Sequence, residues 1–174
     1  MTPARRLGAL YHLPFTIPMS SAYADGLRML AGRELSVEGV RARLLDREHP
    51  PEAVETAIRQ LLASGALDDR RVAQAYARTA ATVKGRGRLR VLRELSAMGI
   101  AKDIASEAVG EVFGDIDERS LIAKAIQKKL RGRARLDTPQ DRSKIYQYLM
   151  RQGFTPAAIV ASLRRLPGGG KGEG

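Results

Sequence analysis

The sequence predicts an all-α protein, made of three tandem three-helix units that resemble helix-turn-helix folds in an elongated arrangement. Three observations support this: the composition, a repeat of about 50 residues, and the apolar spacing inside that repeat. Aromatic residues make up only 5% of the chain, and tryptophan is absent. A core must therefore be built mainly from Leu, Ile, Val and Ala. That composition favours helices, because strands select aromatic and β-branched side chains.

The repeat becomes visible when Glu48, Gly99 and Gly153 are aligned, at intervals of 51 and 54 residues. Relative to each anchor, positions −8, −4, +6, +10 and +13 are aliphatic in every copy. These fifteen residues are Val40, Leu44, Val54, Ile58, Leu61, Val91, Leu95, Ala105, Val109, Val112, Ile145, Leu149, Ile159, Leu163 and Leu166. The first two positions share one helix face, and the last three share a face of the next helix. Each copy therefore contains two amphipathic helices joined by a turn.

The turn carries glycine in the second and third copies, at Gly99 and Gly153. Glycine tolerates the left-handed conformation that commonly ends a helix. Thr155 and Pro156 then suit the N-cap and first turn of the following helix. The first copy has Glu48 where glycine is expected. In that copy we expect His49-Pro50-Pro51 to make the turn instead.

A further helix precedes each pair. In the second and third copies its apolar positions fall at the same offsets, −27 and −23, occupied by Val72 and Tyr76 and by Ile126 and Leu130. The first copy offers Tyr23, Leu27 and Leu30 at similar spacing. Each unit is therefore predicted to consist of a helix, a loop, a second helix, a tight turn and a third helix. The predicted organisation is an irregular N-terminal arm (1–18), unit 1 (19–67), unit 2 (68–114), unit 3 (115–166) and a flexible Gly-rich tail (167–174).

The charge is high and unevenly distributed. The chain has 30 basic and 19 acidic side chains, a net charge of +11, and residues 1–58 hold seven of each sign. Residues 59–174 therefore carry the whole excess, which indicates a polyanionic partner such as a nucleic acid. The absence of cysteine excludes disulfides and thiolate metal sites. No apolar run reaches the roughly 18 residues of a membrane helix, and no signal peptide is evident, so we expect a cytoplasmic protein without a membrane partner.

Two basic runs occupy the same place in the second and third units, in the loop before the middle helix. They comprise Lys84, Arg86, Arg88, Arg90 and Arg93, and Lys128, Lys129, Arg131, Arg133 and Arg135. Glycines in both runs let the backbone approach a partner, and a helix N-terminus adjoins each, which together favour phosphate binding. The alternative is a solvated basic loop. Tyr146 and Tyr148 could stack on bases, although their helix also contributes Ile145 and Leu149 to the core.

No catalytic or metal-binding constellation is found in the sequence. His12 and His49 have no partners at spacings typical of a triad or a metal site. Asp68 and Asp69 precede a helix, where a cap is favoured over the alternative of a paired-carboxylate site. We therefore expect no enzyme activity, no metal and no cofactor.

The sequence resembles the RecX family of bacterial recombinase regulators over nearly all of residues 20–166. The motifs that carry the resemblance are Leu67-Asp68-Asp69-Arg70-Arg71-Val72-Ala73-Gln74-Ala75-Tyr76, Lys84-Gly85-Arg86-Gly87-Arg88-Leu89-Arg90, Glu94-Leu95 and Met98-Gly99-Ile100. Val72 stands where the family usually has Phe, and Arg47-Glu48 replaces its usual Lys-Gly. The resemblance implies three tandem three-helix repeats and a regulator, mainly an inhibitor, of the RecA recombinase. It further implies binding along the groove of the RecA filament on single-stranded DNA, which suppresses ATP hydrolysis, strand exchange and repressor cleavage.

Under this resemblance, the two basic runs face the DNA or acidic patches of the filament, and we expect a monomer that binds single-stranded DNA directly but weakly. The alternative is a helix-turn-helix protein that acts directly on nucleic acid. Such proteins place base-reading side chains at the start of a recognition helix. The third helices here begin near Pro51, Ala101 and Thr155, which offer little for reading bases.

Overall fold

The computed structural model describes residues 21–130 and 138–166. The predicted arm (1–18), the Gly-rich tail (167–174), and Arg131, Arg133 and Arg135 lie outside the described residues. Within the described ranges the chain forms nine helices and no strand: α1 (Ser21–Gly32), α2 (Val37–Leu45), α3 (Pro51–Ala63), α4 (Asp69–Thr82), α5 (Arg88–Ala97), α6 (Lys102–Gly114), α7 (Glu118–Leu130), α8 (Pro139–Gln152) and α9 (Pro156–Arg164).

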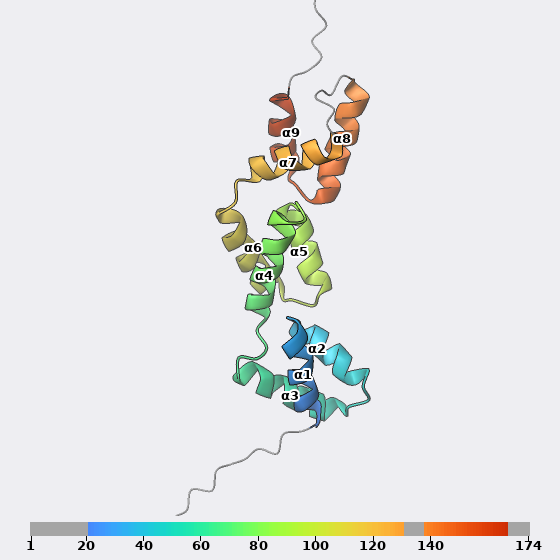
Figure 1. Ribbon diagram of the computed structural model, residues 1–174, viewed down its shortest axis with the longest axis vertical. Coiled ribbons are helices and arrows are strands. Elements are labelled where there is room, and N and C mark those ends of the chain that lie inside the picture. Colours follow the sequence, from blue (N-terminus) through green and yellow to red (C-terminus); the bar gives the residue numbers. More distant parts are fainter. Residues whose placement is uncertain (1–20, 131–137, 167–174) are drawn as a thin grey trace, which may run out of the picture.

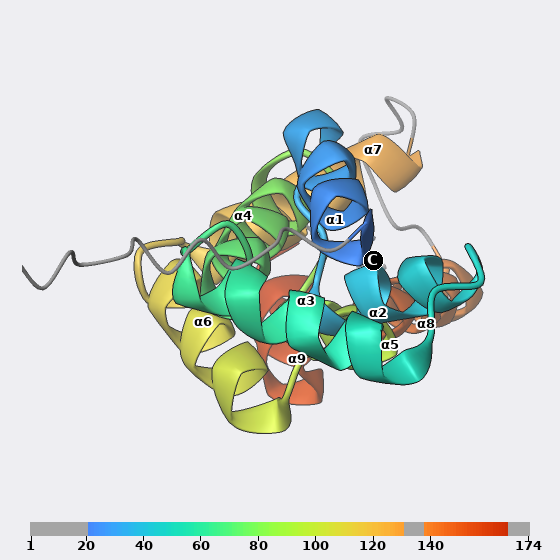
Figure 2. The same cartoon turned by 90° about the horizontal axis from the view of Figure 1, so that it is seen from below.

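The helices group by threes into units that follow one another along the long axis of the molecule (Figure 1). Unit 1 contains α1–α3, unit 2 contains α4–α6 and unit 3 contains α7–α9. Viewed from below, unit 1 lies in front of the other two (Figure 2). The predicted all-α class, with three tandem three-helix repeats in an elongated arrangement, is confirmed.

The core is built from the repeated aliphatic positions, as predicted. Fourteen of the fifteen are buried, and Leu166 is half-buried. Each fully buried Leu, Ile or Val side chain contributes about 1.5–3 kcal/mol to folding through removal of apolar surface from water. The buried residues form two clusters, one within unit 1 and one that runs without a break through units 2 and 3. Units 2 and 3 therefore support each other through a shared core.

The turn that ends each middle helix has the same backbone conformation in all three units. Gly99 and Gly153 have φ of +77° and +89°, and Glu48 has φ of +62°. Glu48 is the one non-glycine residue with positive φ among the described residues. The left-handed turn predicted at Gly99 and Gly153 is therefore present, and unit 1 has the same conformation at Glu48, a residue for which it costs about 1–2 kcal/mol.

The two junctions between units are built in the same register. At the first, the Ser36 hydroxyl donates a hydrogen bond to the carbonyl oxygen of Met98, at 2.6 Å. At the second, the amide of Gly87 donates to the carbonyl oxygen of Gln152, at 2.8 Å. Both donors stand twelve residues before their anchor, and both acceptors stand one before the next anchor. The start of each middle helix thus docks on the turn of the following unit.

This docking explains where glycine is required. A Cβ atom on Gly99 would lie 2.4 Å from the Cβ of Glu38, and one on Gly153 would lie 2.3 Å from the amide nitrogen of Arg90. Such distances leave no room for a side chain. Glu48 is exposed, and its turn carries no such docked helix in the described part of the chain. Unit 1 therefore keeps the turn conformation but not the need for glycine.

Candidate nucleic-acid interface

Two cations of the first basic run are used inside the protein. Arg86 Nη1 lies 2.5 Å from Glu94 Oε2, and Arg90 Nε lies 2.9 Å from Glu94 Oε1. The hydroxyl of Tyr76 donates a third hydrogen bond to the same carboxylate, at 2.8 Å. All these side chains are half-buried. Arg86 therefore holds the loop before α5 against that helix, and Arg90 pairs with Glu94 within α5, so neither cation stands free for a partner.

The pKa of Glu94 reflects this network. Burial raises the pKa more than any other single influence does, because it penalises the charged form. The hydrogen bonds from Arg90, Tyr76 and Arg86 together outweigh burial, so the pKa lies below its ordinary value. Burial, followed by the hydrogen bond to Glu94, raises the pKa of Tyr76. The carboxylate is therefore ionised at neutral pH and bound by two guanidinium groups.

Glu94→Gln should lower the free energy of unfolding at pH 7 by about 1–3 kcal/mol, because two half-buried guanidinium groups lose their counter-charge. Since the folded pKa is depressed, the contribution of Glu94 is complete above its ordinary pKa of 4.5 and is lost as the pH falls through the folded value. The difference in the free energy of unfolding between Glu94→Gln and the natural protein should therefore become smaller below pH 4.5. Urea unfolding from pH 7 to pH 3 measures it. A difference that stays constant over this range contradicts the assignment.

The matched control is Glu34→Gln. This carboxylate pairs with Arg71 at 3.0 Å, and both side chains are nearly half exposed. Exposed pairs contribute less than about 1 kcal/mol. Its replacement should change stability little at any pH in the same range.

The remaining cations of the first run divide into one covered residue and two exposed ones. The guanidinium of Arg88 lies 5.5 Å from the ring centre of Phe113 on α6, and its side chain is half-buried. Lys84 and Arg93 are exposed. The ammonium of Lys84 lies 5.3 Å from the ring centre of Tyr76, a cation–π distance that leaves its outer side open to solvent.

The second run begins in the last turn of α7. Lys128 and Lys129 are exposed there, and the ammonium of Lys129 lies 5.4 Å from the ring centre of Tyr148 on α8. Tyr146 and Tyr148 are both half-buried and pack against the core of units 2 and 3. Both tyrosines are therefore packing residues of this core.

Helix α8 brings the two basic runs together. Lys129 lies over Tyr148, and the amide of Gly87, inside the first run, donates to the carbonyl oxygen of Gln152. Tyr148 and Gln152 are four residues apart, which is about one helical turn. Two segments from different units therefore reach neighbouring turns of one helix.

Two further cations on α8 were missed by the sequence reasoning. Lys144 and Arg151 are exposed and, with Tyr148, follow the spacing of one helix face. They do not form a consecutive basic run, because they are seven residues apart. Helical spacing was the available signal. We use the term basic side for the exposed cations of the two runs and of α8, namely Lys84, Arg93, Lys128, Lys129, Lys144 and Arg151.

The other sequence candidates are structural. Asp68 is the N-cap of α4, as predicted, and accepts hydrogen bonds from the amides of Arg70 and Arg71. The Asp69 carboxylate accepts from the amide of Val37 at 2.8 Å and so links units 1 and 2. Among the described residues, no group of three or more acidic or histidine side chains is placed to hold a metal ion. In the same ranges, none of the helices combines the length and apolar character needed to cross a membrane.

Three family models match the chain in order. They are described as the first, second and third three-helix domains of RecX, and they match residues 22–61, 68–109 and 117–161. The regulatory protein RecX of Pelodictyon phaeoclathratiforme is 30% identical over 145 residues, which cover 83% of this chain and 88% of that protein. The chain belongs to the RecX family.

Other RecX proteins agree with this assignment. The regulatory protein RecX of Geobacillus kaustophilus is 28% identical over 155 residues, 88% of this chain but only 57% of that longer protein. The crystal structure of RecX from Lactobacillus salivarius superposes with a TM-score of 0.76 at 20% identity, over 85% of this chain and 96% of that one. The RecX fold is thereby confirmed. The family consists of regulatory proteins, so this chain is not an enzyme.

The third helix of unit 2 bears on the rival interpretation, a helix-turn-helix protein that reads DNA. In this RecX-family chain α6 carries Asp103, Glu107 and Glu111, all exposed. Their spacing of four places them on one face. A helix with three carboxylates on its exposed face is repelled by DNA phosphates, so α6 is unsuited to be a recognition helix in the major groove.

Proposed function

We propose that this protein regulates the RecA recombinase, mainly as an inhibitor. It binds the RecA filament on single-stranded DNA along the helical groove and suppresses ATP hydrolysis, strand exchange and repressor cleavage. The observation that carries the proposal is the basic side that α5, α7 and α8 build on an elongated RecX-family chain. An elongated molecule can span several protomers of a filament while its cations approach the DNA phosphates.

The predicted cations have different roles. Lys84, Arg93, Lys128 and Lys129 contact phosphates directly, and Lys144 and Arg151 extend the same side. Arg86 positions the loop before α5 through Glu94, Arg90 pairs with Glu94 within α5, and Arg88 is held over Phe113. Arg131, Arg133 and Arg135 continue the second run in the sequence and remain part of the proposal. Binding to bare single-stranded DNA is then direct, weak and sensitive to salt, and the protein acts as a monomer.

The experiment is a titration of the DNA-dependent ATPase of the cognate RecA recombinase with this protein at two salt concentrations. We expect loss of ATPase below one molecule per recombinase protomer, with weaker inhibition at the higher salt concentration. Unchanged ATPase together with retained affinity for bare DNA would instead favour the helix-turn-helix protein that acts directly on nucleic acid.

A further inference from the structure

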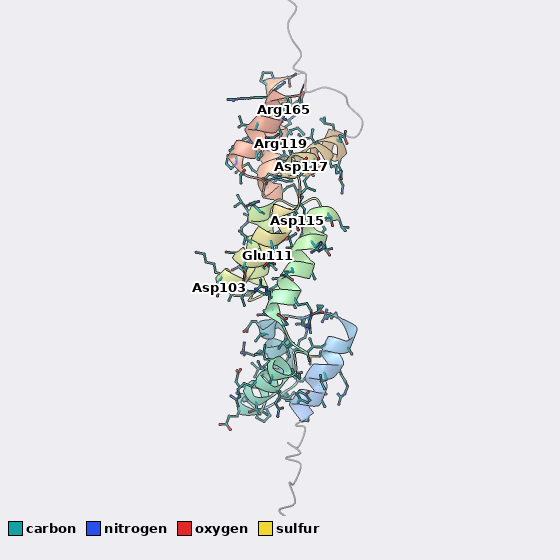
Figure 3. The ribbon with its side chains drawn as sticks, turned by 90° about the vertical axis from the view of Figure 1, so that its left-hand side faces the viewer. Asp103, Glu111, Asp115, Asp117, Arg119 and Arg165 are labelled. Carbon is teal, nitrogen blue, oxygen red and sulfur yellow. The ribbon has the colours of Figure 1, made fainter. Side chains whose placement is uncertain are left out.

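An acidic row runs along the protein away from the basic side. Residues 103–118 contain six carboxylates and no lysine or arginine, in a chain whose net charge is +11. We define the acidic row as Asp103, Glu107, Glu111, Asp115, Asp117 and Glu118. Its first four members are spaced by four residues: Asp103, Glu107 and Glu111 share one face of α6, and Asp115 is the C-cap of that helix. In Figure 3, Asp103, Glu111, Asp115 and Asp117 follow one another along one side of the molecule. Helices α5 and α8 lie toward the opposite side (Figure 1).

Only part of this charge is neutralised within the protein. Arg70 pairs with Glu107 at 3.0 Å and with Glu111 at 2.6 Å. Asp103, Asp115, Asp117 and Glu118 have no lysine or arginine within ion-pair distance in the part of the chain that the structure describes. Asp117 accepts hydrogen bonds from the Ser120 hydroxyl and the Arg119 amide, which hold its carboxylate at the start of α7. Asp103, Asp115 and Asp117 therefore present uncompensated negative charge to solvent, and Glu118 is half-buried beside them.

The upper end of the row adjoins a groove between α7 and α9, with a volume of about 720 Å³. Small and apolar side chains line it, among them Ala123, Ile126, Ala158 and Ala161. Asp117 and Glu118 of the acidic row also line the groove, together with Arg119 and Arg165. Figure 3 shows Asp117, Arg119 and Arg165 on the same side as the rest of the row. The acidic row and the apolar groove therefore form one continuous surface.

We propose that this surface binds a basic segment of a protein, with an apolar side chain in the groove and Lys or Arg side chains along the acidic row. The partner is a protein because a row of carboxylates repels nucleic acid, whereas guanidinium and ammonium groups complement it. This inference rests on the proposed function. In a filament the basic side faces the DNA, and the acidic row contacts a Lys/Arg-rich surface of a recombinase protomer. The protein thus binds both components of the filament at once.

The test compares two double variants with the same change in charge. Asp103→Lys/Asp115→Lys reverses two exposed members of the row that have no ion pair in the described part of the chain. Glu52→Lys/Asp46→Lys is the control, since both residues are exposed in unit 1 and Glu52 occupies the repeat position of Asp103, four residues after the anchor. Because like charges at an interface are strongly unfavourable, the first variant should bind the recombinase filament at least about tenfold more weakly than the natural protein. The control should bind at least as well as the natural protein.

A second readout, affinity for a bare single-stranded oligonucleotide, separates the two proposals. Both variants should retain it or gain affinity, because both become more basic. If the natural protein does not bind the filament, the proposed function fails. If it binds and the two variants bind equally, the acidic row is not an interface. If Asp103→Lys/Asp115→Lys is unfolded by circular dichroism, Asp103→Asn/Asp115→Asn is used with the same criteria and a smaller expected loss.

Two further measurements test the groove and the nature of the partner. Ala161→Phe places a large side chain at the groove without changing charge, and it should also weaken filament binding. Unchanged binding by this variant contradicts a role for the groove. Sedimentation of the natural protein alone tests whether the basic segment belongs to a second copy of this chain. Self-association that the Asp103→Lys/Asp115→Lys variant abolishes would overturn the recombinase as the partner.

Discussion

Replacing Gly153 by alanine is expected to lower the free energy of unfolding by about 3 kcal/mol or more, and Tm by about 6–12 °C. Two effects combine at this position. The φ angle of +89° disfavours any side chain, and a Cβ atom would lie 2.3 Å from the amide nitrogen of Arg90. The obstructing atoms include backbone of α5, which cannot rotate away as a flexible side chain could. Thermal unfolding followed by circular dichroism measures the change.

Two other glycines separate these effects. Gly65 has φ of +69°, and no atom lies within 4 Å of the place that a Cβ would take, so Gly65→Ala should cost only about 1 kcal/mol. Gly87 has an ordinary φ of −80°, but its Cβ would lie 2.4 Å from the carbonyl carbon of Gly153. Gly87→Ala should therefore lower the free energy of unfolding more than Gly65→Ala does and less than Gly153→Ala does. Equal losses for Gly65 and Gly153 would show that the junction of units 2 and 3 is not closely packed in solution.

Removing four charges from the basic side should weaken binding to single-stranded DNA by about 10²–10³-fold near 0.1 M salt. The variant replaces Lys84, Arg93, Lys128 and Lys129 by glutamine. Each lost phosphate contact should reduce the slope of log affinity against log salt by about 0.7, or about 3 in total. Fluorescence anisotropy of a labelled oligonucleotide over a salt series measures both quantities.

The control removes the same charge from unit 1, by replacing Arg28, Arg33, Arg47 and Arg59, all exposed, with glutamine. This variant should keep most of the salt slope. Equal loss of the salt slope in both variants would indicate a general effect of net charge. An unchanged slope in the variant of Lys84, Arg93, Lys128 and Lys129 would show that these residues are not part of the interface. Arg86 and Arg90 are left intact, because their loss would leave Glu94 without its ion-pair partners. A change in stability could then not be separated from a change in binding.

The sequence determines much of the fold because helical periodicity is a local property. Val40, Leu95 and Ile159 could be assigned to the core from spacing alone, and the left-handed turns at Gly99 and Gly153 followed from the glycine at each helix end. The N-cap at Asp68 is equally local. Such features depend on a few neighbouring residues, which the sequence displays directly.

The candidate site was only partly predictable because its contacts cross between elements. The pair of Arg90 with Glu94 follows helical spacing, but the contact of Arg86 with the same carboxylate depends on the path of the loop before α5. The meeting of Lys129 with Tyr148 depends on how α7 crosses α8. A basic run in the sequence therefore shows where cations are concentrated, but not which of them already have partners inside the protein.

The turn at Glu48 also sets a limit on assembly. Each junction is a head-to-tail contact between unlike surfaces, and contacts of this kind can in principle be repeated without end and build fibres. Continuation requires a glycine at the receiving turn, because the arriving helix comes within 2.4 Å of where a Cβ would stand at Gly99. Glu48 presents a side chain at that place. A helix that docked on this turn in the same manner would meet the Glu48 side chain, so unit 1 does not offer the receiving surface that units 2 and 3 offer.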